Sequence, residues 1–276
     1  MKLVTYSQKN DMRLMSGVLI EDRVHGYTWN DNVQSLIERN IRTIVPTHES
    51  KSAAEVAFKV PFRPGKIVAV GRNYAAHAAE LNNEVPKEPL LFAKLTSSLL
   101  DPNGVITWDS SLTSQVDWEG ELAVIIGKTA RNVREDQAYD YVYGYTIAND
   151  ISARDLQDND DQWIRAKGLD TFCPFGPYIA TRDEIPDPHD LTVTTAVNGD
   201  VMQNASTSLM IYKIPYLVAY CSRAFTLHPG DVILTGTPSG VGKAQKPPRF
   251  LQDGDEVTVS ITGLGSLTNR CAVSST

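Results

Sequence analysis

Short apolar runs, separated by Gly, Asn, Asp and Pro, dominate the hydrophobic pattern from residue 66 onward. Runs of this length that are rich in β-branched residues predict strands. The predicted strands cover residues 66–71, 90–100, 121–127, 141–150, 190–199, 231–236 and 256–263.

Two segments of the same region predict helices instead. Residues 73–83 are rich in alanine, a strong helix former, and Asn73 is the expected N-cap. Residues 208–227 are a more apolar helix candidate, with Pro215 at or near its start. Because strands outnumber helices and do not alternate strictly with them, the pattern favours an α+β, mainly β fold over a doubly wound α/β fold.

The first 65 residues predict a small, separate α/β domain. Residues 2–7 and 13–20 have strand-like composition, and residues 30–40 carry apolar positions at helical spacing. A polar stretch then leads to the turn-rich sequence PFRPG at 61–65, which is the expected boundary. We therefore expect one domain over residues 1–65 and a second over residues 66–276.

The charge balance argues against a nucleic-acid-binding role. The 276 residues carry 26 Lys and Arg against 33 Asp and Glu, a net charge of −7, whereas binders of the phosphate backbone show a basic surplus or stripe. No apolar stretch reaches the about 18–20 residues of a membrane span, and the N-terminus lacks the apolar segment of a secretory signal. Three scattered cysteines without a CxxC pair fit a reducing compartment. We expect a cytoplasmic protein with no nucleic-acid or membrane partner.

Several common catalytic motifs are missing from the sequence. GTPSGVGK at 236–243 resembles a phosphate loop but fails in its spacing and in the residue after its lysine. No GxGxxG follows a predicted strand, and neither GxSxG nor HExxH occurs. These absences argue against nucleotide chemistry and serine nucleophiles.

The sharpest local feature is DWEGELAVIIG at 117–127, in which Glu119 and Glu121 are two residues apart. On a strand these side chains point to one face, where two carboxylates repel each other unless a proton or a cation lies between them. Mg²⁺ prefers oxygen ligands and is the natural neutraliser; a solvated strand edge is the alternative. Asp150, at the end of an apolar strand, would be a third ligand, or else a helix N-cap. Three carboxylates would leave about three positions of an octahedral Mg²⁺ shell for water or substrate.

Basic side chains supply further candidate chemistry. His77 and Glu80 are three residues apart on the predicted helix and share a face. A glutamate that holds an imidazole fixes its tautomer and raises its basicity, which suits a general base, although an exposed helix pair has the same spacing. Lys167 lies in an aromatic, Pro-rich segment, where it could bind an anionic substrate or form a structural ion pair. Arg154 has the same two alternatives.

Taken together, these segments resemble the fumarylacetoacetate hydrolase family. The matching segments are GRNYAAHAAE at 71–80, DWEGELAVIIG at 117–127, ANDISARDLQ at 148–157, KGLDTFCPFGP at 167–177, VNGDVMQNASTSLMI at 197–211 and LHPGDVILTGTPSGVG at 227–242. Six ordered motifs over about 66–272 make the resemblance far more specific than any one of them. The first 60 or so residues look like the small N-terminal domain of the shorter, prokaryotic-type members.

The resemblance implies a mixed β-sandwich or β-roll catalytic core, usually in a homodimer, with a site for Mg²⁺ that Mn²⁺ or Ca²⁺ could also occupy. Residue by residue, the family's metal ligands match Glu119, Glu121 and Asp150, its His–Glu dyad matches His77 and Glu80, and its active-site lysine matches Lys167. Its substrate contacts match Arg154, Gln157, Thr237 and Gly236. Residues 66–276 are then the catalytic domain.

The activity implied by the resemblance is metal-dependent hydrolysis of a carbon–carbon bond in a 1,3-dioxo acid. The substrate would be an acylpyruvate such as fumarylpyruvate or acetylpyruvate, and the metal and Lys167 would stabilise the departing pyruvate enolate. The alternatives on the same scaffold are an oxaloacetate decarboxylase and a 2-hydroxyhepta-2,4-diene-1,7-dioate isomerase or decarboxylase. A non-catalytic module that binds 2-oxo acids is the alternative from another class. In a homodimer, the apolar segment 208–220 is the candidate for burial between subunits.

Overall fold

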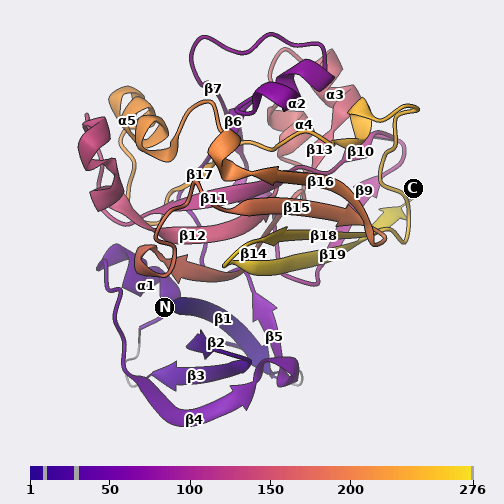
Figure 1. Cartoon of the computed structure of the whole chain (residues 1–276). Coiled ribbons are helices and arrows are strands. Elements are labelled where there is room, and N and C mark those ends of the chain that lie inside the picture. Colours follow the sequence, from indigo (N-terminus) through magenta and orange to yellow (C-terminus); the bar gives the residue numbers. More distant parts are fainter. Residues whose placement is uncertain (9–10, 28–30, 275–276) are drawn as a thin grey trace.

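Two sheets that pack face to face form the body of the protein in a computed structural model, which describes residues 1–8, 11–27 and 31–274 (Figure 1). Strands dominate the described residues, and the helices are short. The expected α+β, mainly β class is therefore confirmed.

The larger sheet has twelve strands and runs through both halves of the chain. In chain order its strands are β1 (Lys2–Gln8), β2 (Asp11–Ile20), β3 (Arg23–Tyr27), β4 (Pro46–Ser52), β5 (Val56–Lys59), β6 (Ile67–Gly71), β7 (Leu90–Lys94), β8 (Leu99–Leu100), β11 (Gly120–Ile126), β12 (Val142–Asn149), β14 (Cys173–Thr181) and β17 (Val232–Leu234). Across the sheet the order is β4-β3-β2-β1-β14-β12-β11-β17-β6-β7, with β5 paired to β1 and β8 to β14. Most neighbours are antiparallel, but β17 and β6 run parallel, as do β14 and β8.

A second sheet of five strands covers one face of the first. Its strands are β9 (Val105–Asp109), β15 (Thr192–Val197), β16 (Asp200–Ser206), β18 (Glu256–Ile261) and β19 (Gly265–Ser274), in the order β16-β15-β18-β19-β9. Buried residues alternate along β15 and β18, which contact β11 and β12, whereas β11 and β12 are buried along their whole length. This pattern is expected when the first sheet is covered on both faces and the second on one. The short strands β10 (Val116–Asp117) and β13 (Ser152–Ala153) pair separately.

The helices lie around the sheets and not between them (Figure 1). They are α1 (Val33–Glu38), α2 (Ala75–Glu80), α3 (Arg154–Asn159), α4 (Ile164–Lys167) and α5 (Ile214–Ala224), with 3-10 turns at Ala53–Glu55, Thr96–Ser98, Glu135–Tyr141, Arg182–Glu184, Thr207–Leu209 and Gly242–Ala244. The helix predicted over 208–227 is shorter than expected and begins at Ile214, with Pro215 in its first turn as predicted. The helix predicted over 30–40 begins at Val33, and residue 30 itself lies outside the described residues.

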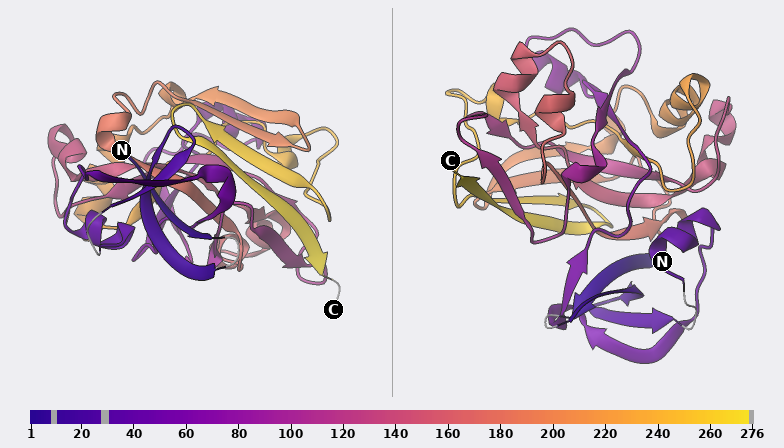
Figure 2. Two further views of the ribbon diagram at one scale, coloured as in Figure 1. Left: turned by 90° about the horizontal axis from the view of Figure 1, so that it is seen from below. Right: turned by 180° about the vertical axis from the view of Figure 1, so that it is seen from behind.

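The N-terminal strands β1–β5 form a lobe that projects from one side of the body (Figure 1 and the right view of Figure 2). The lobe joins the body through backbone pairing, because Lys2 and Leu3 of β1 lie opposite Ala180 and Ile179 of β14. Leu3 also shares a buried apolar cluster with Ile179 and Phe175 of the body. One continuous sheet therefore links the lobe to the rest of the chain.

Asn73 is not the N-cap of α2, contrary to the prediction. The helix begins at Ala75 after Tyr74, and no side chain caps it. The Asn73 amide instead donates to the carbonyl oxygens of Tyr212 (3.0 Å) and Thr235 (2.8 Å), and its oxygen accepts the N–H of Tyr212 at 2.8 Å. A fully buried amide needs partners, and these bonds tie the start of α2 to the residue after β17 and to the segment before α5.

Candidate active site

A cavity of 340 Å³ opens beside the ends of β6, β7 and β11. It is lined by Val70, Gly71, Arg72, His77, Leu81, Asn83, Phe92, Glu119, Glu121, Arg154, Gln157, Asp158, Trp163, Lys167, Thr237 and Lys243. Seven of the ten predicted site residues are among these lining residues. The other three lie directly behind the lining: Glu80 contacts His77, Asp150 contacts Lys167, and Gly236 contacts Glu121.

The three acidic residues predicted as metal ligands converge in space. Glu119, Glu121 and Asp150 each contribute a carboxylate oxygen to a group in which these atoms lie within 4.8 Å of one another. Their exposed fractions are 5%, 1% and 0%. The solvated strand edge is therefore excluded for the two glutamates, and Asp150 is not a helix N-cap, because α3 begins four residues later.

The register of β11 against β12 explains how residues so distant in sequence meet. Gly120 lies opposite Asn149 and Glu121 lies opposite Ala148, so the start of β11 lies beside the end of β12. The N–H of Asp150 continues this pairing by donating to the carbonyl oxygen of Glu119 at 2.8 Å. Antiparallel pairing thus places Asp150 beside the two glutamates.

Gly120 separates the two glutamates because the second sheet leaves no space for a side chain there. A Cβ atom at this position would lie 2.3 Å from Oγ1 of Thr195 on β15. Gly236 has a similar role on the other side of the site, with φ +93° and an N–H that donates to Oε2 of Glu121 at 2.7 Å. Both glycines let backbone approach the carboxylates closely.

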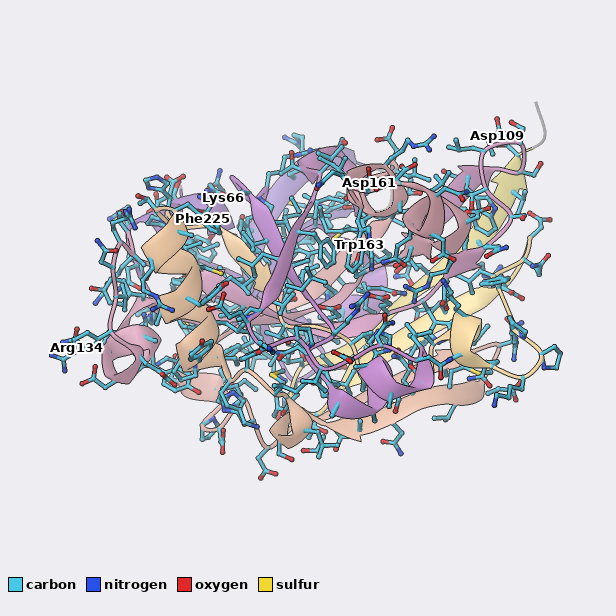
Figure 3. All side chains as sticks on the ribbon, turned by 90° about the horizontal axis from the view of Figure 1, so that it is seen from above. Lys66, Asp109, Arg134, Asp161, Trp163 and Phe225 are labelled. Carbon is cyan, nitrogen blue, oxygen red and sulfur yellow. The ribbon has the colours of Figure 1, made fainter. Side chains whose placement is uncertain are left out.

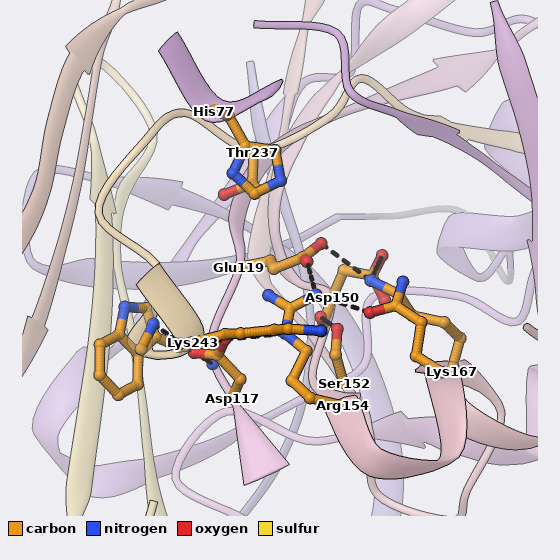
Figure 4. Close-up of polar contacts among 12 residues, drawn as sticks. His77, Asp117, Glu119, Asp150, Ser152, Arg154, Lys167, Thr237 and Lys243 are labelled. Carbon is orange, nitrogen blue, oxygen red and sulfur yellow. Dashed lines mark hydrogen bonds and ion pairs between the residues drawn. The ribbon is translucent and has the colours of Figure 1, made fainter. Parts of the chain in front are cut away.

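Buried cations pair with most of these carboxylates (Figure 4). Lys167 Nζ lies 2.8 Å from Oε2 of Glu119 and 2.8 Å from Oδ2 of Asp150. Arg154 bridges Oδ2 of Asp117 (2.8 Å) and Oε1 of Glu119 (2.7 Å). Burial by itself would raise the pKa of Glu119, but Lys167 and Arg154 outweigh it and lower that pKa to about 2.

Glu121 differs because no cation pairs with it among the described residues. Its pKa lies well above the usual range, since burial disfavours the charged form and the charges of Asp150 and Glu119 add repulsion. With all carboxylates ionised, the cluster would carry an excess of negative charge, because four buried carboxylates (Asp117, Glu119, Glu121 and Asp150) face three buried cations (Lys94, Arg154 and Lys167). Converging oxygen ligands with an uncompensated negative charge fit a hard divalent cation.

His77 and Glu80 form the predicted dyad. Nδ1 of His77 lies 2.7 Å from Oε1 of Glu80, and Oε2 of Glu80 accepts the N–H of Gly240 at 2.8 Å. His77 is 5% exposed and lines the cavity, which excludes an exposed helix pair. With Nδ1 held by the carboxylate, Nε2 is the nitrogen that can exchange a proton with a molecule in the cavity.

Arg154 keeps one donor group unused. Its Nη2 atom is buried and has no hydrogen-bond partner among the described residues, while Nη1 donates to Oε1 of Gln157 at 2.9 Å. A buried charged donor without a partner is costly, and this one belongs to a residue that lines the cavity. Thr237 also lines the cavity. Its hydroxyl donates to the carbonyl oxygen of Gly120 and accepts a hydrogen bond from the side-chain amide of Gln203.

Comparison with known proteins identifies the family. Residues 66–272 match the sequence model described as fumarylacetoacetate (FAA) hydrolase, C-terminal. The chain belongs to the fumarylacetoacetate hydrolase family. It is therefore an enzyme, as the resemblance implied, and the match covers most of its length.

Relatives of this fumarylacetoacetate hydrolase family member carry several activity names. The mitochondrial oxaloacetate tautomerase of Xenopus laevis is 47% identical over 221 residues, which span 79% of this chain and 69% of that protein. The fumarylacetoacetate hydrolase of Exiguobacterium antarcticum has a similar structure, with a TM-score of 0.88 and 38% identity over 99% of this chain and all of that one. A 2-hydroxyhepta-2,4-diene-1,7-dioate isomerase from Mycobacterium marinum aligns with a TM-score of 0.82 and 38% identity over 99% and 98% of the two chains. None of the described helices is long and apolar enough to cross a membrane.

Sequence reasoning missed three polar residues of the site. Lys94 ends the apolar strand β7, and its Nζ lies 2.8 Å from Oδ1 of Asp150. Asp117 accepts hydrogen bonds from the backbone N–H groups of Gly242 and Lys243, and it also forms an ion pair with Arg154. Gln203 connects Gly120 to the loop after β17. A charged residue inside an apolar run was the available signal for Lys94, because such a residue is buried only with a partner.

Proposed function

We propose that this enzyme catalyses proton transfer between the oxygen and the adjacent carbon of a 2-oxo acid, as in the tautomerisation of oxaloacetate. The observation that carries the proposal is the convergence of Glu119, Glu121 and Asp150 beside a cavity that His77 also lines. The names of the relatives support it, since tautomerases and isomerases of 2-oxo or 2-hydroxydienoic acids are among them.

Glu119, Glu121 and Asp150 would hold the divalent cation, with Mg²⁺ the first choice for an all-oxygen donor set. When bound, the cation would supply a Lewis acid for the keto oxygen of the substrate. Lys167 would share two of these carboxylates with the cation, because its Nζ already lies 2.8 Å from Glu119 and Asp150.

His77 would move the proton. Glu80 holds Nδ1, so Nε2 would take the proton from the enol hydroxyl, or from water beside it, and return a proton to the neighbouring carbon. This exchange redistributes one proton and needs no oxidant or reductant. The unused Nη2 of Arg154 would bind the carboxylate next to the keto group, with Gln157 and Thr237 completing the contacts.

Acylpyruvate hydrolysis is the second candidate. The same dyad favours it, because an imidazole held by a carboxylate can equally remove a proton from water that attacks a carbonyl carbon. In that reaction the carbon–carbon bond breaks and the pyruvate part leaves as an enolate, which Lys167 would help to stabilise. Decarboxylation of oxaloacetate would use the same enolate.

A substrate panel tests the proposal. The loss of enol absorbance would be followed after dilution of oxaloacetate, with pyruvate release measured in parallel and with acetylpyruvate and 2-hydroxyhepta-2,4-diene-1,7-dioate as further substrates. We expect Mg²⁺-dependent acceleration of enol loss without matching pyruvate release, abolished by a chelator and reduced by about 10²-fold or more in His77→Gln. Faster hydrolysis of acetylpyruvate than enol loss would favour the second candidate. Binding without turnover of any substrate would favour the non-catalytic module.

A further inference from the structure

Arg72 is a cationic side chain that lines the cavity and has no ion pair or hydrogen bond of its own among the described residues. We propose that Arg72 binds the distal carboxylate of the substrate, so that the enzyme prefers dicarboxylic 2-oxo acids to monocarboxylic ones. This inference rests on the proposed function and adds the substrate class to it.

The other cations of the cavity are already committed to protein carboxylates. Lys167 and Arg154 pair with the acidic cluster, and Lys243 Nζ lies 2.6 Å from both carboxylate oxygens of Asp158. The first carboxylate of a substrate would take the one unused donor of Arg154, Nη2, so a second anionic group would have to displace a protein carboxylate from Lys167, Arg154 or Lys243. At Arg72 it would gain a planar guanidinium that can form two parallel hydrogen bonds.

The backbone at Arg72 is held in an unusual conformation. Its φ is +57°, a left-handed value that costs free energy for a residue other than Gly, Asn or Asp. The flanking residues enforce it: Gly71 pairs with Leu90 across β6 and β7, and the side chain of Asn73 makes three hydrogen bonds. A strained position that is fixed from both sides and faces a cavity is typical of functional sites.

An apolar wall accompanies Arg72 along the cavity. Trp163 packs against Gly71, where a Cβ atom would lie 3.1 Å from its ring, and meets Phe92 edge-on with the ring centres 5.2 Å apart. Figure 3 shows Trp163 among the side chains over the body of the protein. With Leu81, these rings offer a surface for the carbon chain of a substrate whose two ends are charged. Arg154 and Arg72 would then bind the carboxylates at opposite ends of one substrate molecule.

The test pairs a substrate change with a protein change. Oxaloacetate and its 4-methyl ester differ in the distal charge, and Arg72→Asn removes the guanidinium while keeping a residue that tolerates positive φ. We expect Arg72→Asn to lower kcat/KM, and the affinity measured by equilibrium binding in Mg²⁺, by about 10- to 100-fold for oxaloacetate. The ester should be a poor substrate of the wild type and be unchanged by the substitution. Arg72→Lys should recover part of the loss, because it restores charge without the planar fork.

Equal losses for oxaloacetate and the ester, or no loss for either, would overturn the proposal, since both results mean that Arg72 does not bind the distal carboxylate. Arg134→Asn is the matched control, because this exposed arginine pairs with Asp136 on another part of the surface (Figure 3). A wild type that turns over neither compound would refute the proposed function. The ratio of the two dissociation constants in wild type and Arg72→Asn would then still decide the role of Arg72.

Discussion

Glu121 is the residue whose substitution should weaken metal binding without lowering the stability of the metal-free protein. It is 1% exposed, and no cation pairs with it among the described residues. Burial raises its pKa, and the charges of Asp150 and Glu119 raise that pKa further. We predict that Glu121→Gln weakens Mg²⁺ binding by at least about tenfold, because even changes outside the ligand shell cost that much. Without metal, the same variant should be as stable as the wild type or more stable, since a buried repulsion is removed.

Calorimetric titration with Mg²⁺ and thermal unfolding in a chelator measure these two effects. Glu135→Gln, at an exposed glutamate, is the control and should change neither quantity. Unaltered Mg²⁺ affinity in Glu121→Gln would remove this residue from the ligand set.

Lys94 should matter for stability as much as any apolar core residue. Its Nζ is buried among Oδ1 of Asp150 (2.8 Å) and the carbonyl oxygens of Phe172 (2.8 Å) and Ile151 (3.1 Å). Lys94→Met leaves these acceptors without their cation, so we predict a loss of about 3–5 kcal/mol in the free energy of unfolding. Urea denaturation in a chelator would measure it against the exposed control Lys128→Met. A loss equal to that of the control would show that Lys94 is not needed to compensate Asp150.

Much of the site could be predicted at the residue scale, because several of its functional residues lie only two or three positions apart in the sequence. Glu119 and Glu121 share a strand face, and His77 and Glu80 share a helix face. Lys94 and Asp117 escaped because each is a single charged residue whose partner comes from another element. Asp150, the partner of Lys94, lies beside the two glutamates only because β11 pairs with β12.

At the scale of elements, His189 links pH to the start of α5. Its Nε2 accepts the N–H of Ile214 at 3.2 Å, which requires an unprotonated nitrogen. Burial lowers the pKa of His189 below 6.5, and Lys213 adds to this effect while Asp187 opposes it. A histidine with a depressed folded-state pKa contributes stability that is present above its unfolded-state pKa and is lost as the pH falls below it.

We therefore predict that the wild type loses more stability between pH 7 and pH 5 than His189→Gln, which keeps an acceptor but cannot titrate. Chemical denaturation at several pH values measures the difference, and buffers of constant ionic strength keep other titrations equal in the two proteins. Parallel stability curves for the two proteins over this range would contradict the role of His189.

Strand β14 shows why part of the fold could not be predicted. It is buried along its whole length and pairs with both β1 and β12, yet it contains Pro174 and Pro177. Proline lacks the N–H of a ladder and argues against a central strand. A register shift between Tyr145 and Ile147 of β12 falls opposite Pro177, whereas Pro174 lies near the start of β14, opposite Leu100 of β8. Likewise, the polar sequence of β4 gave no strand pattern, because β4 is an edge strand in which every side chain is partly or fully exposed.

At the scale of the whole molecule, the two-domain division stays a prediction. The turn at 61–65 marks where the lobe strands end, but β1 extends the sheet of the body and Leu3 packs in the same cluster as Phe175. Composition and turn residues predict where a boundary lies along the chain. They cannot predict strand pairing across that boundary, which depends on residues more than 170 positions apart.

The assembly is also a prediction, based on the outer face of α5. Its inner face is buried, whereas Tyr212, Tyr216 and Tyr220 form a stacked, half-buried row with ring centres 5.4 and 6.0 Å apart. Aromatic residues of this kind are enriched in interfaces. We predict a homodimer of twice the 30.4 kDa chain mass in light scattering, and partial dissociation when Tyr216 is replaced by Glu. A species of 30.4 kDa at all concentrations would contradict a dimer.

Glu119, Glu121 and Asp150 lie where the start of β11 meets the end of β12, and we propose that they bind one hard cation beside His77. Anomalous diffraction from crystals grown with Mn²⁺ tests this most directly. We expect one anomalous peak in contact with oxygen atoms of Glu119, Glu121 and Asp150, at the edge of the cavity. Fully occupied Mn²⁺ elsewhere, with Glu119 and Asp150 still paired only with Lys94, Arg154 and Lys167 and no ion in contact with Glu121, would contradict metal binding at this site.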